Sequence, residues 1–350
     1  MTTALPPLPP GAPGALARRL APLVAQARPL AAVVRGELVE SVHLGHLVVT
    51  GADGEVLAAV GDPDAEVWPR SSLKPLQATA MVQAGLDLAD APALLALAAA
   101  SHSGEQRHLD GVRALLARAG LDEGALANTP DLPFGAEAAA AWRAAGHGPA
   151  SVAQNCSGKH AAMLLTCVSA DWDPAGYLDL GSPLQRQVRA TVADLTGSRR
   201  SRTTVDGCGA PLLSTPLSGL ARAFGRIASA PAGTPEQLVA AAMGAHPEMV
   251  GGTGRDVSAL LAGVGGLVAK DGAEGVYAAG LPDGRAVALK VLDGTSRAAP
   301  VALAAALRAL GVRAPVLEQV GTAPVLGHGR PVGALVPTLP EDLLGGSARS

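Results

Sequence analysis

Residues 33–60 read VVRGELVESVHLGHLVVTGADGEVLAAV, and this stretch decides how the fold begins. From Val33 to Thr50, β-branched residues alternate with polar ones, which is the pattern of a strand with one buried face. Gly51-Ala52-Asp53-Gly54 has the composition of a hairpin turn, and the residues from Glu55 to Val60 are again apolar. The stretch therefore predicts two antiparallel strands.

The rest of the chain changes character twice. From Ser71 to about Arg226 it is rich in Ala and Leu at helical spacing, with loops at 128–133 and 171–174, and a further helix is expected from Pro235. Strand patterns return at 275–279 and 286–291, and a last helix is expected over 300–310. Strands at both ends with helices between them predict an α+β fold, an antiparallel sheet of N- and C-terminal strands packed against helices, with a helical middle region.

Composition limits the classes of function. The formal charge of −3 is spread along the chain, and three Trp, two Tyr and two Phe are too few for base stacking, so nucleic-acid and membrane-surface binding are not expected. Cys156, Cys167 and Cys208 are an odd number of thiols, which favours a reduced, cytoplasmic protein. We expect residues 1–30 to be a flexible Pro/Ala-rich extension and residues 31–340 to be one catalytic domain.

A serine and a lysine lie one helical turn apart in WPRSSLKPLQ, residues 68–77. Ser71 and Lys74 would project from the same face of the first turn of a helix. A lysine amine can take the serine proton if its pKa falls from about 10.4 toward neutrality, through burial or a second cation. The alternative is that Ser71 or Ser72 caps the helix and Lys74 is solvated.

Further polar motifs supply partners for this pair. A phosphate-binding loop is excluded at 153–160 because Ala153 stands where that loop needs glycine. Lys270 and Gly272 have the K-x-G spacing of an edge strand that lines acyl-serine sites. Each motif also has a plainer reading, since cysteine is often a small apolar core residue and an aspartate can simply shape a turn. The motifs are SHSGE (101–105), QNCSGKHAAMLL (154–165), DGCGAP (206–211), HPEMVGGTGRD (246–256) and KDGAEGV (270–276).

Together with RSSLKPLQ, these ordered motifs resemble the bacterial L-asparaginase II family, the rhizobial-type L-asparaginases, which are similar in fold to serine β-lactamases and glutaminases. The resemblance covers about residues 33–312. It implies hydrolysis of L-asparagine to L-aspartate and ammonia by a cytoplasmic homodimer. The Pro-rich stretch before residue 30 departs from the family pattern.

The resemblance also implies roles for individual residues, carried over motif by motif. Two Ser/Lys pairs would be catalytic, Ser71 with Lys74 and Ser103 with Lys270. Zinc would be bound by Cys156, Lys159 and Cys208, and no organic cofactor is implied. The residues expected to line the substrate site are Arg70, Asn155, Lys159, His160 and Asp206.

Three other functions share parts of this pattern. A glutaminase would use the same chemistry on a longer amide. A β-lactamase or penicillin-binding-type acyl-serine hydrolase shares S-x-x-K and K-x-G, although it would normally be exported. A non-catalytic small-molecule-binding protein would keep the pocket without turnover.

Overall fold

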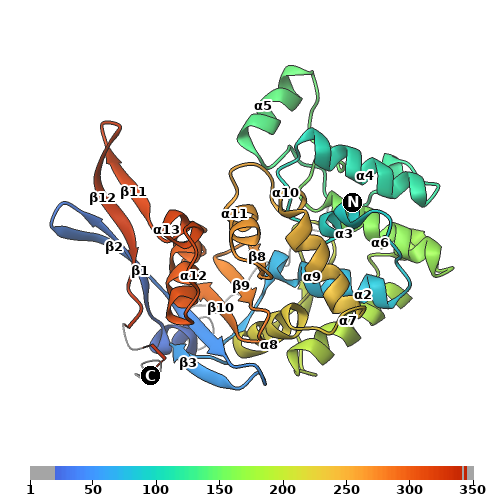
Figure 1. Cartoon of the computed structure of the whole chain (residues 1–350). Helices are drawn as coiled ribbons and strands as arrows, with labels where there is room; N and C mark the ends of the chain where they lie inside the picture. The colour runs from blue at the N-terminus through green and yellow to red at the C-terminus, as the bar shows by residue number, and fades with distance from the viewer. Residues whose placement is uncertain (1–19, 341–342, 345–350) are drawn as a thin grey trace, which may run out of the picture.

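The computed structural model describes residues 20–340, 343 and 344. It is an α+β structure in which one antiparallel sheet lies beside a large group of helices (Figure 1). The order of the sheet is β11-β12-β1-β2-β10-β9-β8, and β3 also pairs with β2. The strands of this sheet are β1 (Arg28–Arg35), β2 (Leu38–Thr50), β3 (Val56–Val60), β8 (Val268–Gly272), β9 (Val276–Gly280), β10 (Ala286–Val291), β11 (Ala323–Gly327) and β12 (Arg330–Pro337).

N- and C-terminal strands pair in this sheet, as the sequence predicts. β1 lies between β12 and β2, and β2 pairs with β10. A Cβ on Gly45 would lie 2.2 Å from the Lys290 carbonyl oxygen, so β2 needs glycine where it passes from β1 to β10. β8 is the edge strand at one end, as the K-x-G spacing at Lys270 predicts.

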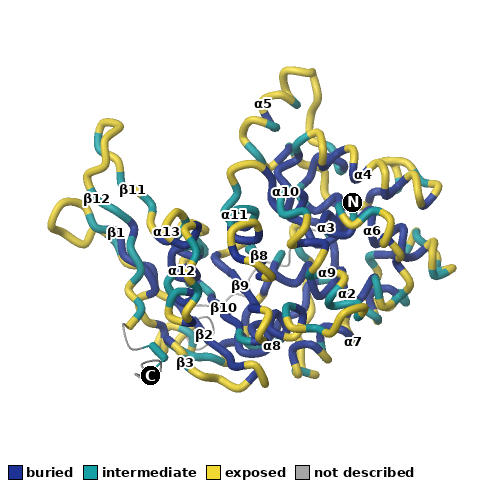
Figure 2. Tube along the Cα trace, in the orientation of Figure 1, coloured by how far each residue is buried: buried dark blue, intermediate teal, exposed yellow. Residues whose placement is uncertain are grey.

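Helices cover both faces of the central strands. α8 (Leu217–Ala228) and α12 (Ala298–Ala309) each pack against β9 and β10. Every residue of β9 is buried, which places the two helices on opposite faces of the sheet. The burial colours follow this arrangement: the central strands are buried, whereas the tips of the β1–β2 and β11–β12 hairpins are exposed (Figure 2).

The predicted helical middle region packs beside β8. Among its helices, α2 contacts α7 and α9, and α3 contacts α6 and α9. The remaining helices and short strands are α2 (Lys74–Gln83), α3 (Pro92–Ala98), α4 (Gln106–Arg118), α5 (Ala136–Ala144), α6 (Ser157–Ser169), α7 (Pro183–Thr196), α9 (Pro235–Ala245), α10 (Pro247–Val250), α11 (Asp256–Gly263), α13 (Val316–Val320), β4 (Glu66–Val67), β5 (Thr203–Val205), β6 (Pro211–Leu213) and β7 (Thr215–Pro216), with 3₁₀ turns η1 (Arg70–Leu73), η2 (Glu123–Ala125) and η3 (Pro174–Gly176).

The start of the chain differs from the prediction in two ways. The single strand predicted over 33–50 is wrong: it is a hairpin, because Gly36 has φ +55 and allows the chain to reverse between β1 and β2. Residues 20–26 are helical, and the His46 ring is 3.0 Å from the Leu23 carbonyl oxygen, so the fold begins before residue 31. Residues 1–19 of the extension predicted over 1–30 lie outside the described residues.

None of the helices among the described residues has the length and apolar character that a membrane crossing requires.

Candidate active site

The predicted pair Ser71 and Lys74 lies at the junction of η1 and α2. Ser71 is partly buried, and Lys74 is 1% exposed. The Lys74 amine donates to the Ala100 carbonyl oxygen and, over 2.9 Å, to the Ser101 hydroxyl. Among the described hydrogen bonds there is none between Ser71 and Lys74, so their catalytic partnership stays a prediction. The serine that the structure brings to Lys74 is Ser101, the first residue of the SHSGE motif.

The loop that carries Ser101 and Ser103 is fixed by backbone hydrogen bonds on both sides. Ser101 and Ser103 N–H groups donate to the carbonyl oxygens of Val250 and Gly251. The Ser103 hydroxyl is buried and donates to Gly251 over 3.0 Å. Within the described chain, the Lys270 amine donates to the carbonyl and carboxylate oxygens of Asp271, and no hydrogen bond joins it to Ser103. The second predicted pair therefore also stays a prediction.

A cavity of about 290 Å³ opens beside Ser71. The Arg255 guanidinium lies 2.8 Å from the Asp271 carboxylate at its wall, and 4.8 Å from the centre of the Phe134 ring. The Tyr277 hydroxyl is buried there without a hydrogen-bond partner among the described residues. The cavity is small and carries charged and polar groups in a largely apolar wall, which suits a small substrate held by a few polar contacts. Its polar lining includes Ser71, Ser101, Asn155, Arg255, Asp271 and Tyr277.

Lys270 reaches the same region from the edge strand β8 and is fully buried. The Ser72 hydroxyl donates to the Lys270 carbonyl oxygen over 3.0 Å, which ties η1 to β8. Burial, with help from the nearby Lys74 and Arg255 charges, lowers the pKa of Lys270 to about 8 against the opposing effect of Asp271. A lysine with this pKa can be neutral near physiological pH, as a general base must be.

The three predicted zinc ligands come together beside this cavity. Cys156 precedes α6, Lys159 lies in its first turn, and Cys208 lies on the turn between β5 and β6. The two thiols pack in one small buried cluster, and the Lys159 amine is 3.4 Å from the Cys208 sulfur. Contact with Cys208 lowers the pKa of Cys156 well below its usual value, with help from the Lys74 and Lys159 charges, despite burial.

The pKa of Lys159 is shifted in the opposite direction to that of Lys270. Burial alone would lower its pKa, but Cys208, Cys156 and Asp206 raise it. Two thiols and one amine are a donor set that a soft or borderline cation such as zinc accepts. Among the described residues, no group of three or more His, Cys, Asp or Glu side chains forms another candidate metal site.

Arg70 and Asp206 are joined by an ion pair next to the thiols. The Arg70 Nε donates to the Asp206 carboxylate over 2.6 Å. Arg70 has φ +53, an uncommon conformation for a residue with a side chain, and such strain is concentrated at functional sites. Burial raises the pKa of Asp206, but Lys159 and Arg70 outweigh it, so the net pKa is lowered and the carboxylate is charged.

Asn155 and His160 flank the same cluster. Asn155 lines the cavity, and its side-chain oxygen accepts from Gln154 over 2.9 Å. The Tyr177 hydroxyl accepts from the Ala127 N–H, so its own proton is available to the His160 Nδ1, 2.8 Å away. Burial, followed by the Lys159 and Lys74 charges, lowers the pKa of His160 well below its usual value. The ring is therefore neutral, and its Nε2 has no hydrogen-bond partner in the described part of the chain.

Sequence reasoning missed Ser101, Arg255 and Asp271 as members of the site. The chain has only four lysines, Lys74, Lys159, Lys270 and Lys290, although Lys and Arg together number 27. Three of the four, Lys74, Lys159 and Lys270, are almost fully buried. Scarcity of lysine on an arginine-rich chain was thus a usable signal for the catalytic lysines, whereas the roles of Arg255 and Asp271 depend on which neighbours they meet in the fold.

A buried lysine that reaches serine hydroxyls at the wall of a polar cavity is typical of hydrolases that use lysine in place of histidine. The model of the L-asparaginase II family matches residues 31–337. The chain belongs to the L-asparaginase II family, whose members are asparaginase-type amidohydrolases. A search of curated proteins finds no match.

Proposed function

We propose that this protein is an L-asparaginase that hydrolyses L-asparagine to L-aspartate and ammonia. The observation that carries the proposal is the placement of Lys74, which lies one turn after Ser71. Its buried amine donates to the Ser101 hydroxyl, and Ser71 and Ser101 both line the cavity. Family membership supports the amide as the bond that is cleaved. The charged groups around the cavity suit a substrate that carries both a carboxylate and an ammonium group.

In the proposed mechanism, Ser71 is the nucleophile and Lys74 is its base. As the Ser71 oxygen attacks the side-chain amide carbon, its proton is taken by the Lys74 amine, which can accept it only in the unprotonated form. The C–N bond then breaks, the amide nitrogen takes that proton, and ammonia leaves an aspartyl ester on Ser71. A water molecule then gives a proton to the same amine and attacks the ester; the Ser71 oxygen takes that proton as its bond to the acyl carbon breaks, and aspartate is released. Catalytic hydrogen bonds often shorten only when substrate is bound, so the Ser71 to Lys74 contact is expected to form at that stage.

Ser103 and Lys270 form the second proposed pair. The lowered pKa of Lys270, about 8, supports a role in proton transfer at neutral to alkaline pH. Two lysines near one group of serines disfavour each other's protonation, so one can be neutral while the other stays charged. The charged one would bind the substrate carboxylate or the developing oxyanion.

Substrate recognition is proposed to involve residues next to the thiols, of which only Asn155 lines the cavity. Asp206 would bind the α-ammonium group, since its lowered pKa keeps it anionic. Arg70 holds that carboxylate in place, and Asn155 offers an amide at the cavity wall. Lys159 and the neutral His160 complete this proposed set.

Zinc is the proposed metal, with Cys156, Lys159 and Cys208 as its ligands. The lowered pKa of Cys156 supports one thiolate at this cluster, whereas the same contact raises the pKa of Cys208, which zinc would have to deprotonate. When bound, zinc would supply a positive charge that keeps the ligands deprotonated and stabilises negative charge on the substrate. The ligands themselves connect α6 to the β5–β6 turn, which carries Asp206. Their proposed contribution is therefore to position the substrate rather than to activate the attacking group.

Several further properties are part of the proposal. The helices and sheet are proposed to have the serine β-lactamase-like arrangement. The protein is proposed to be a cytoplasmic homodimer. A glutaminase, a β-lactamase or penicillin-binding-type hydrolase, and a non-catalytic binding protein remain the alternatives, because a small polar cavity with buried lysines and serines is compatible with each of them.

One assay separates these functions. Ammonia release is measured with L-asparagine and with L-glutamine, and ring opening is measured with a panel of β-lactams, all with the full chain at pH 8. We expect the highest kcat/KM with L-asparagine. Turnover of only glutamine or only β-lactams would replace the proposed substrate, and binding of asparagine without turnover would identify a binding protein.

A further inference from the structure

A continuous chain of contacts joins the two buried lysines through residues outside the predicted Ser/Lys pairs. Lys74 donates to the Ser101 hydroxyl over 2.9 Å, and the Arg255 Nη1 donates to the Ser101 carbonyl oxygen over 3.2 Å. The Arg255 Nη2 donates to the Asp271 Oδ2 over 2.8 Å. The other carboxylate oxygen of Asp271 accepts from Lys270. Arg255 and Asp271 therefore connect the loop that holds Lys74 to the strand that carries Lys270.

We propose that Asp271 and Arg255 are positioning residues for the proposed asparagine hydrolysis: Asp271 holds the Lys270 amine at the cavity, and Arg255 fixes Asp271 against the Ser101 loop. The inference rests on the proposed function, because it assigns these residues to the reaction of the same site. Neither residue is placed here as a group that bonds to substrate.

The geometry of the pair supports this role. A carboxylate has two oxygens, and in Asp271 each is used by a different cation, so the carboxylate cannot rotate without losing a contact. The planar Arg255 fork is itself held by the Ser101 carbonyl oxygen, the Asp271 carboxylate and the Phe134 ring. Both residues line the cavity, so they hold the buried Lys270 amine next to the place where substrate would bind.

The two residues act on the charge of Lys270 in opposite directions. The charged groups that face Lys270 are Asp271 from its own strand, Lys74 from α2 and Arg255 from the loop before α11. Asp271 raises the pKa of Lys270, whereas Lys74 and Arg255 lower it. Removing the carboxylate should therefore lower this pKa, and removing the guanidinium should raise it.

Tyr277 and Asp256 also lie near the ion pair between Arg255 and Asp271. Burial raises the pKa of Tyr277 on β9 well above its usual value, so the phenol stays protonated. Burial, together with the charge of Asp271, raises the pKa of Asp256 at the start of α11. Neither group is among those that shift the pKa of Lys270. They should therefore not reverse the expected fall of this pKa without the carboxylate, or its expected rise without the guanidinium.

The test measures the titration of each lysine directly. The full chain is labelled with [¹³C]lysine, and the ¹³Cε shifts are followed by NMR between pH 6 and 11; four lysines give four resonances, of which Lys270 is assigned by its loss in Lys270→Met. We expect a Lys270 midpoint near 8 in the wild-type chain. In Asp271→Asn the midpoint should fall by about one unit or more, and in Arg255→Met it should rise by about one unit.

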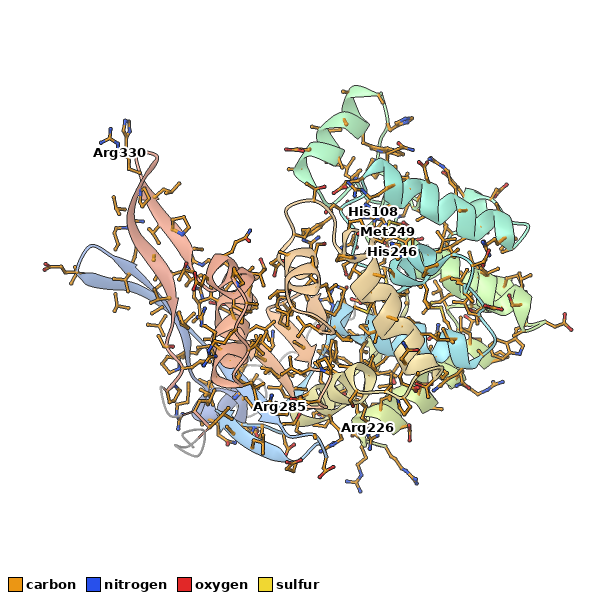
Figure 3. The ribbon with its side chains drawn as sticks, in the orientation of Figure 1. His108, Arg226, His246, Met249, Arg285 and Arg330 are labelled. Carbon is orange, nitrogen blue, oxygen red and sulfur yellow. The ribbon has the colours of Figure 1, made fainter. Side chains whose placement is uncertain are left out.

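Controls are present within the same chain. Lys290 reports on each sample, because neither Asp271 nor Arg255 is among the groups that shift it. Asp283→Asn and Arg285→Met change a surface ion pair of the same type, 2.6 Å apart, and should leave the Lys270 midpoint unchanged. Arg285 lies in the lower part of the molecule in Figure 3, and it is not among the residues that line the cavity. A Lys270 midpoint that stays constant, or that moves in the same direction in both site variants, would overturn the proposal.

Steady-state kinetics distinguish a loss of positioning from a loss of folding and from a wrongly proposed substrate. Asp271→Glu keeps the charge but moves it, so we expect a normal Lys270 midpoint with a kcat at least tenfold lower and a nearly unchanged KM. An unchanged kcat would refute the positioning role. The NMR titration needs no turnover, so opposite shifts in a chain that does not hydrolyse asparagine would reject only the proposed substrate. Normal hydrolysis with unmoved midpoints would reject only the positioning role.

Discussion

Two buried lysines beside the same cavity have opposite electrostatic environments. Lys270 faces Lys74 and the Asp271 carboxylate, which also contacts Arg255, and the pKa of Lys270 is lowered to about 8. Lys159 faces two thiols and Asp206, and its pKa is raised although it is just as deeply buried. Burial favours the neutral amine in both places, so the neighbours decide which lysine keeps its proton. The difference suits a proton-transferring role for Lys270 and a charged, substrate-binding role for Lys159, whose amine would have to lose its proton before it could bind zinc.

The largest loss of turnover is expected when the proposed nucleophile and base, Ser71 and Lys74, are replaced. Ser71→Ala and Lys74→Ala should each lower kcat by about a thousandfold or more, because one removes the nucleophile and the other its base. The double variant should be little worse than either single one, since the two groups act as a unit. Ammonia release under saturating asparagine is the measurement.

Ser72→Ala is the matched control for this prediction. Its hydroxyl is buried and donates to the Lys270 carbonyl oxygen rather than lining the cavity. We expect turnover within about tenfold of the wild-type value, with a small loss of stability from the missing hydrogen bond. Near-wild-type turnover in Lys74→Ala would refute the role of Lys74 as base.

The second prediction uses stability against pH to compare the two lysines. The folded-state pKa of Lys270, about 8, is below its ordinary value of 10.5, so between these pH values the unfolded chain binds more protons than the folded chain. Stability should therefore rise with pH through this window, by up to about 3 kcal/mol from this group. Lys159 has a raised pKa, so its contribution is lost only as pH rises above 10.5.

Urea denaturation at pH 7.5 and 10 measures this difference. Relative to the wild-type chain, Lys270→Met should show a rise in the free energy of unfolding that is smaller by up to about 3 kcal/mol, because methionine has no proton to lose. Lys159→Met is the matched variant and should leave that rise in place. Equal slopes in the wild-type chain and Lys270→Met would contradict the lowered pKa of Lys270.

The third prediction concerns the metal on the thiol side. Protein purified without chelator should contain zinc, and Cys208→Ser should remove it, because serine is a poor zinc ligand. Removal of zinc should raise KM for asparagine about 10- to 100-fold and lower kcat less, since the metal is proposed to position substrate. Elemental analysis with steady-state kinetics checks both parts. A zinc content near zero with full activity would exclude the metal from the reaction.

The smallest effect is expected at the third thiol, Cys167. It is buried in α6 away from the other two, and burial raises its pKa to about 11. Cys167→Ala should cost about 1 kcal/mol of stability through lost packing, without changing zinc content or turnover. Thermal unfolding and elemental analysis of this variant show whether the effect of Cys208→Ser is specific to its position. Loss of zinc in Cys167→Ala would assign the metal to a different set of ligands.

The sequence predicts the class of the fold better than its strand boundaries. The predicted pairing of N- and C-terminal strands is confirmed. The strands could be predicted because the alternation of β-branched and polar residues is a local signal. The β1–β2 turn was missed, since one glycine at Gly36 inside a strand pattern is ambiguous. β11 and β12 were missed as well, and they form the hairpin whose tip carries Arg330 in Figure 3.

The sequence by itself determined the family and the residues that can carry the chemistry. Six motifs with their serines, lysines and thiols are local patterns, and a residue's capacity to donate, bind or accept a proton is a property of its type. The tertiary structure alone decided which of these residues meet. Lys74 is bound by Ser101, and Lys270 by Asp271. Opposite pKa shifts of Lys270 and Lys159 follow from those contacts, because the field at a buried amine depends on distance and burial, which spacing along the chain does not contain.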